Sequence, residues 1–520
     1  MNIKDIVIPL TFAVAITLAM QYFFGPKVQE VTKQSAGQRI EMQQQMQDLA
    51  KPLNIEVEFA SQQAQSEHVS EVVTSYAHLE FSSLGGCLKN VTYHRTVDGK
   101  SIDLTTMVPT ADYEKAQGCF LVALDKETPY YYILREHKDD NEKATLTYEA
   151  DGQTAHIAKT FTVYKNSYQI DMGIIITPNQ EVQARVLFPA PLLQGSTKAE
   201  HIAAIIEEQD QNVVKYQLSR ARRKLQDSLW AFPTLIGAED RYFAHVLFKD
   251  QHHFVQRGYY QVLPDRIITV VEGPVMKKGT GIAWDMSFYM GPKEHAALAS
   301  ADQRLEVLLD YGWLSFLCKP MLAFMNWINE YVHNFGLAII LFTLLIRLLL
   351  IPLTWPHTKN AKKMREMQNK LKYINQRYKD DPEVLERERT ELYKKYGLSG
   401  LSGLGGGCLP LLLQMPIFFA MNRVLTSSIE LYQAPFLWIP DLSSKDPLYI
   451  LPILVAVSMF LNTASLAANE DTQSKVSGFI MAIVFGAFSI GFSAGLSLYI
   501  FASTFVGAAQ IYIQKKFKML

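Results

Sequence analysis

The stretch FGLAIILFTLLIRLLLIPLT, residues 335–354, is apolar and has the length of a membrane-spanning helix, because crossing the hydrocarbon layer of a bilayer takes about 20 residues. Arg347 is its only charged residue, and a rise of ~1.5 Å per residue places it near mid-depth. Five other segments have comparable length and composition: residues 6–24, 408–428, 448–468, 476–492 and 494–513. The sequence therefore predicts a polytopic α-helical membrane protein with six transmembrane helices.

The average composition conceals this organisation. The chain has 520 residues, 19% of them charged, four cysteines and a net charge of −1, which excludes a disordered chain, a disulfide scaffold and a globally basic nucleic-acid binder. Residues 335–520 hold 19 Lys and Arg and 12 Asp and Glu, a net charge of +7. Subtraction from the totals of 50 and 51 leaves 31 and 39 for residues 1–334, a net charge of −8. Two parts of opposite charge therefore cancel.

Loop charges predict the orientation, since cytoplasmic loops of membrane proteins are rich in Lys and Arg. Residues 355–407 hold 12 basic and 7 acidic residues, whereas residues 429–447 hold one Lys and three acids. Residues 355–407 and both termini are therefore expected in the cytoplasm, with residues 25–334 on the opposite side of the membrane. The basic run from Arg220 to Lys224 does not count against this, because long translocated domains escape the charge rule.

The segment at residues 1–24 is interpreted as an uncleaved transmembrane anchor. A cleaved signal peptide is the alternative, but Lys4 is the only basic residue in its flank and no A-x-A pattern follows Met20. Residues 25–75 are polar and Gln-rich, which predicts a linker.

Residues 76–309 are predicted to form a β-sandwich outside the membrane, since short runs rich in Val, Ile, Thr, Tyr and Phe alternate there with turn residues. Residues 199–225 are expected to form a helical patch within it. Cys87 and Cys119 could form a disulfide in this compartment, but their spacing alone leaves the question open.

Residues 310–334 carry an apolar stripe at helical spacing, flanked by Trp313 and Trp327. This pattern predicts an amphipathic helix lying in the outer headgroup layer, and a core helix of the outer domain is the alternative.

An Arg in the middle of a span costs about 2.5–3.5 kcal/mol and normally faces a partner or water. None of the six predicted spans contains an acidic residue, so we expect Arg347 to line a wet cavity with uncharged polar groups; snorkelling to the cytoplasmic headgroups is the alternative. Arg423, near the outer end of its span, is given no role. The candidate cavity residues are Thr343, Gln414, Asn462, Ser503 and Gln510.

Residues 357–397 are expected to form a cytoplasmic hairpin of two helices, broken at Asp380-Asp381-Pro382. It either meets anionic lipid, the ribosome or an incoming chain, or serves only as a solvated topology signal. Its first helix carries basic residues and methionines: Lys359, Lys362, Lys363, Met364, Arg365 and Met367.

No metal-ligand spacing, nucleophile motif or phosphate-binding motif appears in the chain. The sequence therefore predicts neither an enzyme nor a cofactor or metal site. A transporter or channel remains an alternative, although no internal repeat is visible. An intramembrane enzyme would need a paired nucleophile and base.

In order and spacing, residues 310–520 resemble the YidC-type membrane protein insertases of the YidC/Oxa family, in the form with a large periplasmic domain. The resemblance rests on DYGWL from Asp310, Arg347 followed by IPLT, GGCLPLLLQMPIFFA from Gly406, ELYQAPFLWIPDLSSKDPLYILPIL from Glu430 and AGLSLYIFAS from Ala494. Departures are the Gly-Ser-rich Ser399–Cys408 loop and Ser493, where a Pro is usual.

The resemblance implies a location in a bacterial inner membrane, with residues 25–334 in the periplasm and residues 76–309 as the periplasmic β-sandwich domain. It also implies a five-helix core with a positively charged groove that is open to cytoplasm and lipid. Arg347 would be central in that groove, with Thr343 one turn away. It implies an energy-independent insertase and membrane chaperone for nascent membrane proteins, working alone or with the Sec translocon. The ribosome would be a further candidate partner, and no specific nucleic acid is expected.

Overall fold

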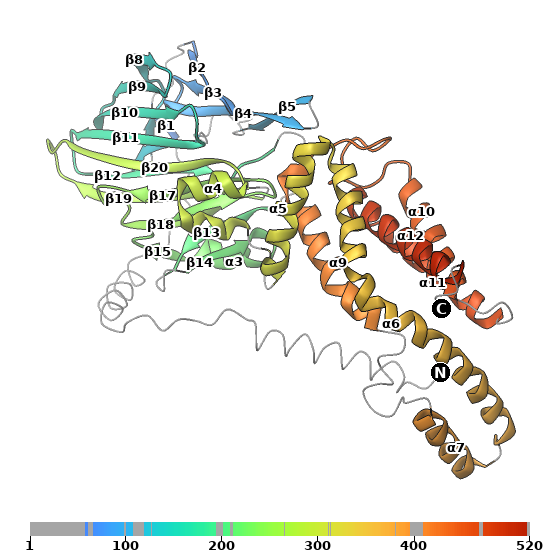
Figure 1. The fold of residues 1–520 in the computed structure, drawn as a ribbon. Helices are drawn as coiled ribbons and strands as arrows, with labels where there is room; N and C mark the ends of the chain where they lie inside the picture. Colours follow the sequence, from blue (N-terminus) through green and yellow to red (C-terminus); the bar gives the residue numbers. More distant parts are fainter. Residues whose placement is uncertain are drawn as a thin grey trace. The chain divides into compact units, whose positions relative to one another are not determined.

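The computed structural model describes residues 58–60, 66–97, 100–107, 119–125, 127–193, 201–208, 212–264, 266–309, 311, 314–379, 381–395, 409–466 and 472–516. The described residues up to 309 form a compact unit of β-sheets, here the β unit, and those from Tyr311 onward form a helical unit (Figure 1). The predicted anchor at residues 1–24, Trp313 and the Ser399–Cys408 loop lie outside the described residues.

The β unit contains three sheets. The nine-stranded sheet is antiparallel throughout and runs in the order β14 (Val213–Gln217), β13 (Ala203–Glu207), β16 (Ile236–Glu239), β17 (Phe243–Asp250), β20 (Ile282–Pro292), β11 (Gln169–Pro178), β10 (Ala155–Tyr164), β9 (Lys143–Asp151) and β8 (Ile133–Asp139). The seven-stranded sheet runs β1 (Glu58–Ala60), β7 (Glu127–Pro129), β6 (Leu121–Leu124), β12 (Val182–Pro189), β19 (Ile267–Met276), β18 (Arg257–Val262) and β15 (Leu229–Ala231). The four-stranded sheet runs β2 (Val69–Val73), β3 (Ala77–Ser82), β4 (Cys87–Val97) and β5 (Lys100–Met107). Its strand β2 lies within residues predicted as linker, so the linker ends earlier than expected.

The two larger sheets pack face to face, which confirms the predicted β-sandwich. Strands alternate between buried and half-buried residues, as in β10, because successive side chains of a strand point to opposite faces. Phe188 of β12 meets Phe288 of β20 edge-on, with ring centroids 5.3 Å apart. The Tyr260 hydroxyl of β18 donates to the Ile205 carbonyl of β13 at 2.6 Å. These contacts join the sheets through an apolar core.

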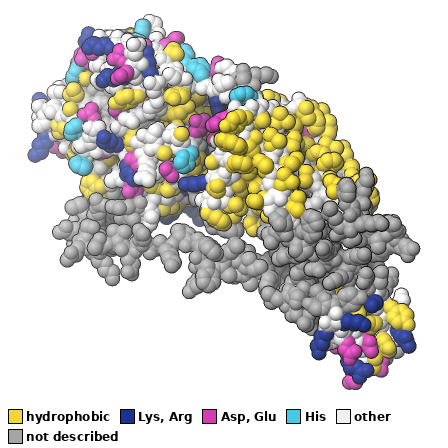
Figure 2. Space-filling model, in the orientation of Figure 1, with side chains coloured by type: hydrophobic (Ala, Val, Ile, Leu, Met, Phe, Trp, Pro, Cys, Tyr) yellow, Lys and Arg dark blue, Asp and Glu magenta, His cyan; other side chains and the backbone are white. Residues whose placement is uncertain are grey.

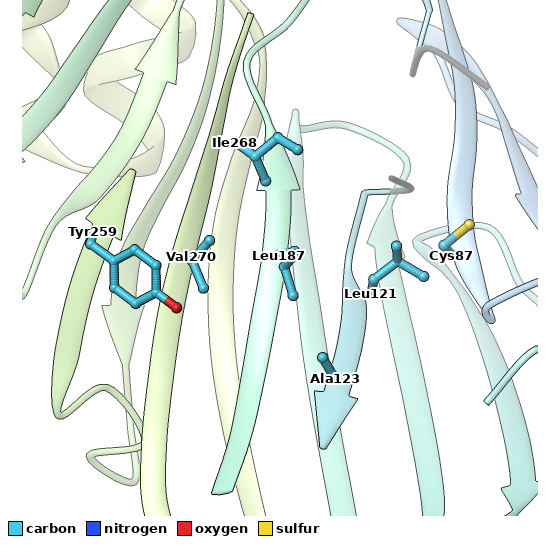
Figure 3. Close-up of a cluster of buried hydrophobic side chains, with 7 residues drawn as sticks. All are labelled: Cys87, Leu121, Ala123, Leu187, Tyr259, Ile268 and Val270. Atoms are coloured by element: carbon cyan, nitrogen blue, oxygen red, sulfur yellow. The ribbon is translucent and has the colours of Figure 1, made fainter. Parts of the chain in front are cut away.

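The opposite face of the seven-stranded sheet is also buried. Tyr259, Val270, Leu187 and Leu121 stand opposite one another on four neighbouring strands and belong to one buried cluster (Figure 3). Two positions further along these strands and on the same face, two arginines lie beside one buried carboxylate. Glu272 Oε1 lies 2.6 Å from Arg185 Nε, and its Oε2 lies 2.7 Å from Arg257 Nη2.

Lys159 of β10 binds backbone segments next to the other two sheets, one between β3 and β4 and one just before β6. Its fully buried Nζ donates to the carbonyls of Gly85, Gly86 and Phe120 at 2.8, 3.0 and 3.1 Å and lies 4.4 Å from the centre of the Tyr132 ring. All three ammonium hydrogens therefore have acceptors. Burial lowers the pKa of Lys159 to about 7, and the nearby Cys87 opposes that shift.

Cys87 and Cys119 are neighbours, since Cys119 pairs with Leu88 in an isolated bridge. Both are buried free thiols, so the disulfide left open by the sequence is not formed in the structure. Burial raises the pKa of Cys87 to about 11, which keeps this thiol protonated at neutral pH.

The helical patch expected at residues 199–225 is wrong for most of its length. Strands β13 and β14 occupy much of it, and in the described part of this segment α3 (Leu218–Asp227) is the α-helix. The β unit ends with α4 (His295–Ala301) and the 3-10 helix η2 (Gln303–Leu309).

The helical unit contains α5 (Ser315–Val332), α6 (Phe335–Arg377), α7 (Pro382–Lys395), α9 (Leu409–Ser427), η4 (Ile429–Leu431), α10 (Ile450–Leu466), α11 (Thr472–Ser489) and α12 (Ala494–Lys516). Helix α12 packs against α6, α9 and α10; α5 packs against α6 and α9, and α11 against α10. Among the described helices, only Ala494–Gln514 passes a test of length and hydropathy for crossing a membrane, while Phe335–Ile351, Ile450–Thr463 and Gly478–Ser489 are shorter apolar helices.

Helix α6 differs from expectation in its length. The apolar segment at residues 335–354 and the first hairpin helix were predicted as separate elements, but they form one helix of 43 residues. Asn334 caps its start by accepting the Leu337 N–H on Oδ1 at 3.0 Å. The helix continues through Pro352 and Pro356, which remove two backbone donors without ending it. The hairpin therefore extends directly from the helix that carries Arg347.

Candidate functional site

Arg347 of α6 points to α12. Its Nε and Nη2 both donate to Ser503 Oγ, at 3.0 and 2.7 Å, and Ser503 is buried. No acidic side chain in the described part of the chain forms an ion pair with Arg347. The guanidinium is thus held by an uncharged hydroxyl and not by a carboxylate.

A third helix joins this contact. Gln414 of α9 donates from Nε2 to the Tyr499 hydroxyl at 2.7 Å and to Ser503 Oγ at 3.3 Å. Arg347, Gln414, Tyr499 and Ser503 are here called the polar cluster. Tyr499 was missed from the sequence, although it lies one helical turn before Ser503 on the same face of α12.

Gly507 leaves room beside the guanidinium. A Cβ atom at this position would lie 3.6 Å from both Arg347 Nη1 and Asn462 Nδ2. Asn462 of α10, one of the candidate cavity residues, is therefore close to the polar cluster, and Gly507 is a second residue that was missed. One turn away, Ser458 of α10 and Thr504 of α12 share a hydrogen bond of 2.6 Å.

The other two candidates are placed differently. Thr343 is buried, and its Oγ1 donates to the Ile339 carbonyl of its own helix at 2.7 Å. It lies one turn before Arg347 on the same helix and makes no hydrogen bond to it. Gln510 is half-buried on α12 and makes no hydrogen bond to the polar cluster.

The segment between α9 and α10 covers one end of the bundle. Asp446 is buried and accepts the Trp438 indole N–H at 3.1 Å and the Leu451 N–H at 2.7 Å. The first amides of α12 are also satisfied there, since the Ala494 and Gly495 N–H groups donate to carbonyls of residues 444 and 442 at 2.6 and 2.9 Å. Phe436 contacts Gly336 so closely that a Cβ there would lie 2.1 Å from the ring. This end, assigned to the outside by loop charge, is closed by packed residues.

The sides of the bundle are apolar. Figure 2 shows a broad hydrophobic surface over the described helices, in contrast with the mixed surface of the β unit. On α9 and α11 the exposed apolar side chains include Met415, Phe419, Phe479, Ile483 and Phe488. In water such a surface would aggregate, and in a bilayer it is the expected exterior.

Helix α5 carries a ladder of aromatic rings. Trp327 is half-exposed, stacks on Phe324 with centroids 5.4 Å apart and meets Tyr331 edge-on at 5.2 Å. Rings of this kind favour the headgroup region of a membrane.

In the hairpin, Met367 is buried, and α7 is tied to α6 by Arg389, whose Nε donates to Asn375 Oδ1 at 2.9 Å. The backbone of α6 is helical where the predicted basic residues lie. The side chains of the predicted basic residues and of one predicted methionine fall outside what the structure describes: Lys359, Lys362, Lys363, Arg365 and Met364.

Two family models match the chain, and the boundary between them falls within α5, a little after the start of the helical unit. Residues 70–324 match the family model of the YidC periplasmic domain, and residues 327–519 match that of the 60Kd inner membrane protein. The chain is thus an inner membrane protein with a periplasmic domain.

Several curated proteins named membrane protein insertase YidC are similar to the chain. The Campylobacter jejuni protein is 42% identical over 231 residues, which cover 44% of this chain and 43% of that protein. The Wolinella succinogenes protein is 29% identical over 98% of this chain and 94% of its own length. The Haemophilus ducreyi protein is 32% identical over 73% of this chain and 72% of its own. The chain belongs to the YidC family of membrane protein insertases.

Proposed function

We propose that this protein inserts integral membrane proteins and helps them fold, and that the polar cluster receives the polar end of a client segment. The observation that carries the proposal is the Arg347 guanidinium, which is bonded to Ser503 Oγ and has no ion-pair partner in the described chain. A positive charge held by neutral groups can attract an acidic or polar client group without first breaking an ion pair.

The energetics favour a hydrated pocket at this depth. An Arg in hydrocarbon costs about 2.5–3.5 kcal/mol, and water with polar neighbours relieves that cost. The hydrocarbon layer is about 30 Å thick, so a client terminus that reaches mid-depth in water has only about half of it left to cross. The packed outer end keeps the pocket from becoming a channel.

The apolar sides of the bundle complete the pathway. The exposed faces of α9 and α11 offer Met415, Phe419 and Phe479 to a client helix that leaves the pocket. A hydrophobic client span gains by moving from the pocket into lipid along these faces. No nucleotide is needed for such a transfer, which agrees with a family of insertases rather than enzymes.

The proposed topology has six transmembrane helices, the first at residues 6–24 and five forming the core. Both termini are cytoplasmic and residues 25–334 are periplasmic. The 12 basic against 7 acidic residues of the 355–407 loop support this orientation. Helix α5 would lie in the outer headgroup layer, and the hairpin would meet anionic lipid, the ribosome or the incoming chain.

The proposed partners are nascent membrane proteins, the phospholipid bilayer and the Sec translocon, and no cofactor or nucleic acid is required. In the described residues no group of three or more His, Cys, Asp or Glu side chains could hold a metal.

The test is complementation in cells depleted of the protein, with pulse-labelling of a small single-span client. Arg347→Lys should retain insertion, whereas Arg347→Ala should lose it tenfold or more. Arg423→Ala is the matched control, because it removes an Arg from an exposed position of the same bundle. Full insertion with both Arg347 variants would overturn the proposal, and an ion flux across liposomes that depends on Arg347 would indicate a channel instead.

A further inference from the structure

The segment between α9 and α10 contains a tight turn whose tip departs from the usual choice of residue. Phe436 and Ile439 exchange both of their backbone hydrogen bonds at 2.8 Å, so residues 437 and 438 form a two-residue turn. Leu437 has a φ of 51°, in the left-handed region that favours Gly, Asn or Asp in such a turn. Local propensity therefore does not explain a bulky apolar residue at this position.

Packing within the chain does not explain this leucine either. Leu437 is 77% exposed, more than any other large apolar residue in the described part of the chain. Its strained backbone thus presents an apolar side chain that has little contact with the rest of the protein. Backbone strain of this kind persists where the surrounding structure holds it, and it clusters at functional positions.

A second apolar stretch with a left-handed residue lies beside the turn. Tyr449 has a φ of 56° and is 52% exposed, and Leu448 before it is 60% exposed. Asp446 Oδ1 accepts both the Leu448 N–H and the Trp438 indole N–H, each at 3.1 Å. One buried carboxylate therefore holds the two stretches next to each other. Leu437, Leu448 and Tyr449 are here called the outer edge.

The outer edge lies level with the first turns of the helices in the bundle. The Phe436 ring packs against Gly336 in the first turn of α6. The Leu442 carbonyl accepts the Gly495 N–H at the start of α12 at 2.9 Å. Because the apolar span of α6 begins at Phe335, these contacts place the turn at the border of the hydrocarbon layer.

The apolar surface of the bundle continues up to this border. Leu337 and Leu341 of α6 are exposed and lie at i and i+4, on one face of the helix. Leu337 directly follows Gly336, the residue that the Phe436 ring covers. The outer edge therefore continues a surface that faces lipid, and it is not an isolated apolar patch in water.

We propose that the outer edge inserts among the acyl chains of the leaflet at the closed end of the bundle, which is the outer leaflet in the proposed topology. Burying a leucine side chain in hydrocarbon is favourable, and tyrosine favours the level at which acyl chains meet headgroups. Since Asp446 and Phe436 connect the outer edge to the packed residues that close this end, lipid contact anchors the closure to the leaflet. The anchoring does not involve the polar cluster.

The test measures how oxygen and water-soluble reagents reach a nitroxide on Leu437→Cys, in the full-length protein in lipid nanodiscs. Cys408→Ser removes one thiol from the background, and the other three cysteines are buried. Power saturation compares collisions of the nitroxide with molecular oxygen, which concentrates among acyl chains, and with a nickel chelate, which stays in water. The oxygen-to-nickel ratio should be severalfold higher than at Lys445→Cys, an exposed charged position of the same segment.

A pair of variants separates the apolar side chain from the fold of the turn. Leu437→Asn keeps a residue that accepts the left-handed backbone but is polar, so the ratio at a Tyr449→Cys label should fall severalfold. Gln433→Asn is the matched control, because Gln433 also has a left-handed φ, of 56°, in the same segment. It should leave the ratio at the Tyr449→Cys label unchanged.

Three results would overturn the proposal. The first is a Leu437→Cys label with the same oxygen-to-nickel ratio as the Lys445→Cys label, because the turn would then lie in water. The second is a Leu437→Cys label that neither reagent reaches, because the turn would then be buried against protein. The third is an unchanged ratio at the Tyr449→Cys label when Leu437→Asn is introduced.

Discussion

Replacing Lys159 by Met should destabilise the β unit strongly. Methionine fills a similar volume but donates no hydrogen bond, so three buried carbonyls, of Gly85, Gly86 and Phe120, would lose their donor. Each unsatisfied buried group costs about 1–3 kcal/mol. The variant also removes a buried charge, which offsets part of that cost. We expect a net loss of about 3–5 kcal/mol in the free energy of unfolding, as when one partner of a buried polar pair is removed.

The loss should depend on pH. The pKa of Lys159 is about 7 in the folded protein and 10.5 in its ordinary state. Between these values the unfolded chain holds the proton more tightly, so this residue makes stability rise with pH from about 7 to about 10.5. Below pH 7 both states are protonated and the contribution is constant. Lys159→Met lacks this term, so its deficit relative to the wild type should grow between pH 7 and pH 9.

Pulse proteolysis of the full-length protein in mild detergent and urea measures this stability, since only unfolded domains are digested. With a slope of about 3 kcal/mol per molar urea, the midpoint should fall by about 1–1.7 M. Lys143→Met, at an exposed position of β9, is the control and should leave the midpoint in place. An unchanged midpoint for Lys159→Met, or the same deficit at pH 7 and pH 9, would refute the reasoning.

Three further predictions concern single contacts. Gly507→Ala should preserve insertion, because the added Cβ lies 3.6 Å from Arg347 Nη1, an ordinary contact distance. Gly507→Val should reduce client insertion severalfold, because the larger side chain would press on the guanidinium. Equal pulse-labelled insertion in both variants would contradict this steric effect. Asp446→Ala should lower the thermal stability of the detergent-solubilised protein by about 1–2 kcal/mol through loss of a helix cap, and Asp446→Asn should lose less; an unshifted melting curve with unchanged Trp438 fluorescence would argue against the cap. Glu272→Ala should cost the β unit about 3–5 kcal/mol in urea by leaving two arginines unpaired, and a wild-type midpoint would show that the pair is dispensable.

The sequence predicted the β-sandwich and the neighbourhood of Arg347 for clear physical reasons. Alternating apolar residues dictate which face of a strand is buried, and β10 follows that rule along its length. A single charged residue in an apolar helix needs polar neighbours, and Ser503 and Asn462 lie at comparable depth in two other predicted spans. The sequence does not determine how α12 is rotated about its own axis, and so which of its residues face α9. That rotation places Tyr499 and Ser503 against Gln414 but leaves Gln510 out of the polar cluster.

Two predictions of secondary structure were wrong, one for residues 203–217 and one for α6. Residues 203–217 contain good helix formers, but Ile205, Ile206, Val213 and Val214 are β-branched, and pairing of β13 with β16 decided the outcome. Tertiary pairing routinely overrides such preferences. For α6, the prediction of two separate elements was wrong, since one helix continues through Pro352 and Pro356. A proline removes one backbone donor and adds a local clash, which a long helix packed against its neighbours can absorb.

The continuous α6 has a mechanical consequence. At ~1.5 Å per residue its 43 residues form a rod of ~65 Å, with Arg347 ~18 Å from the first residue, Phe335. A 10° tilt about that end would carry the other end, at Arg377, through ~11 Å and the guanidinium through ~3 Å. That is enough to separate the guanidinium from Ser503. The prolines at 352 and 356 lie between the hairpin and Arg347. The bending stiffness of α6 around these prolines therefore determines how far a force on the hairpin displaces the guanidinium.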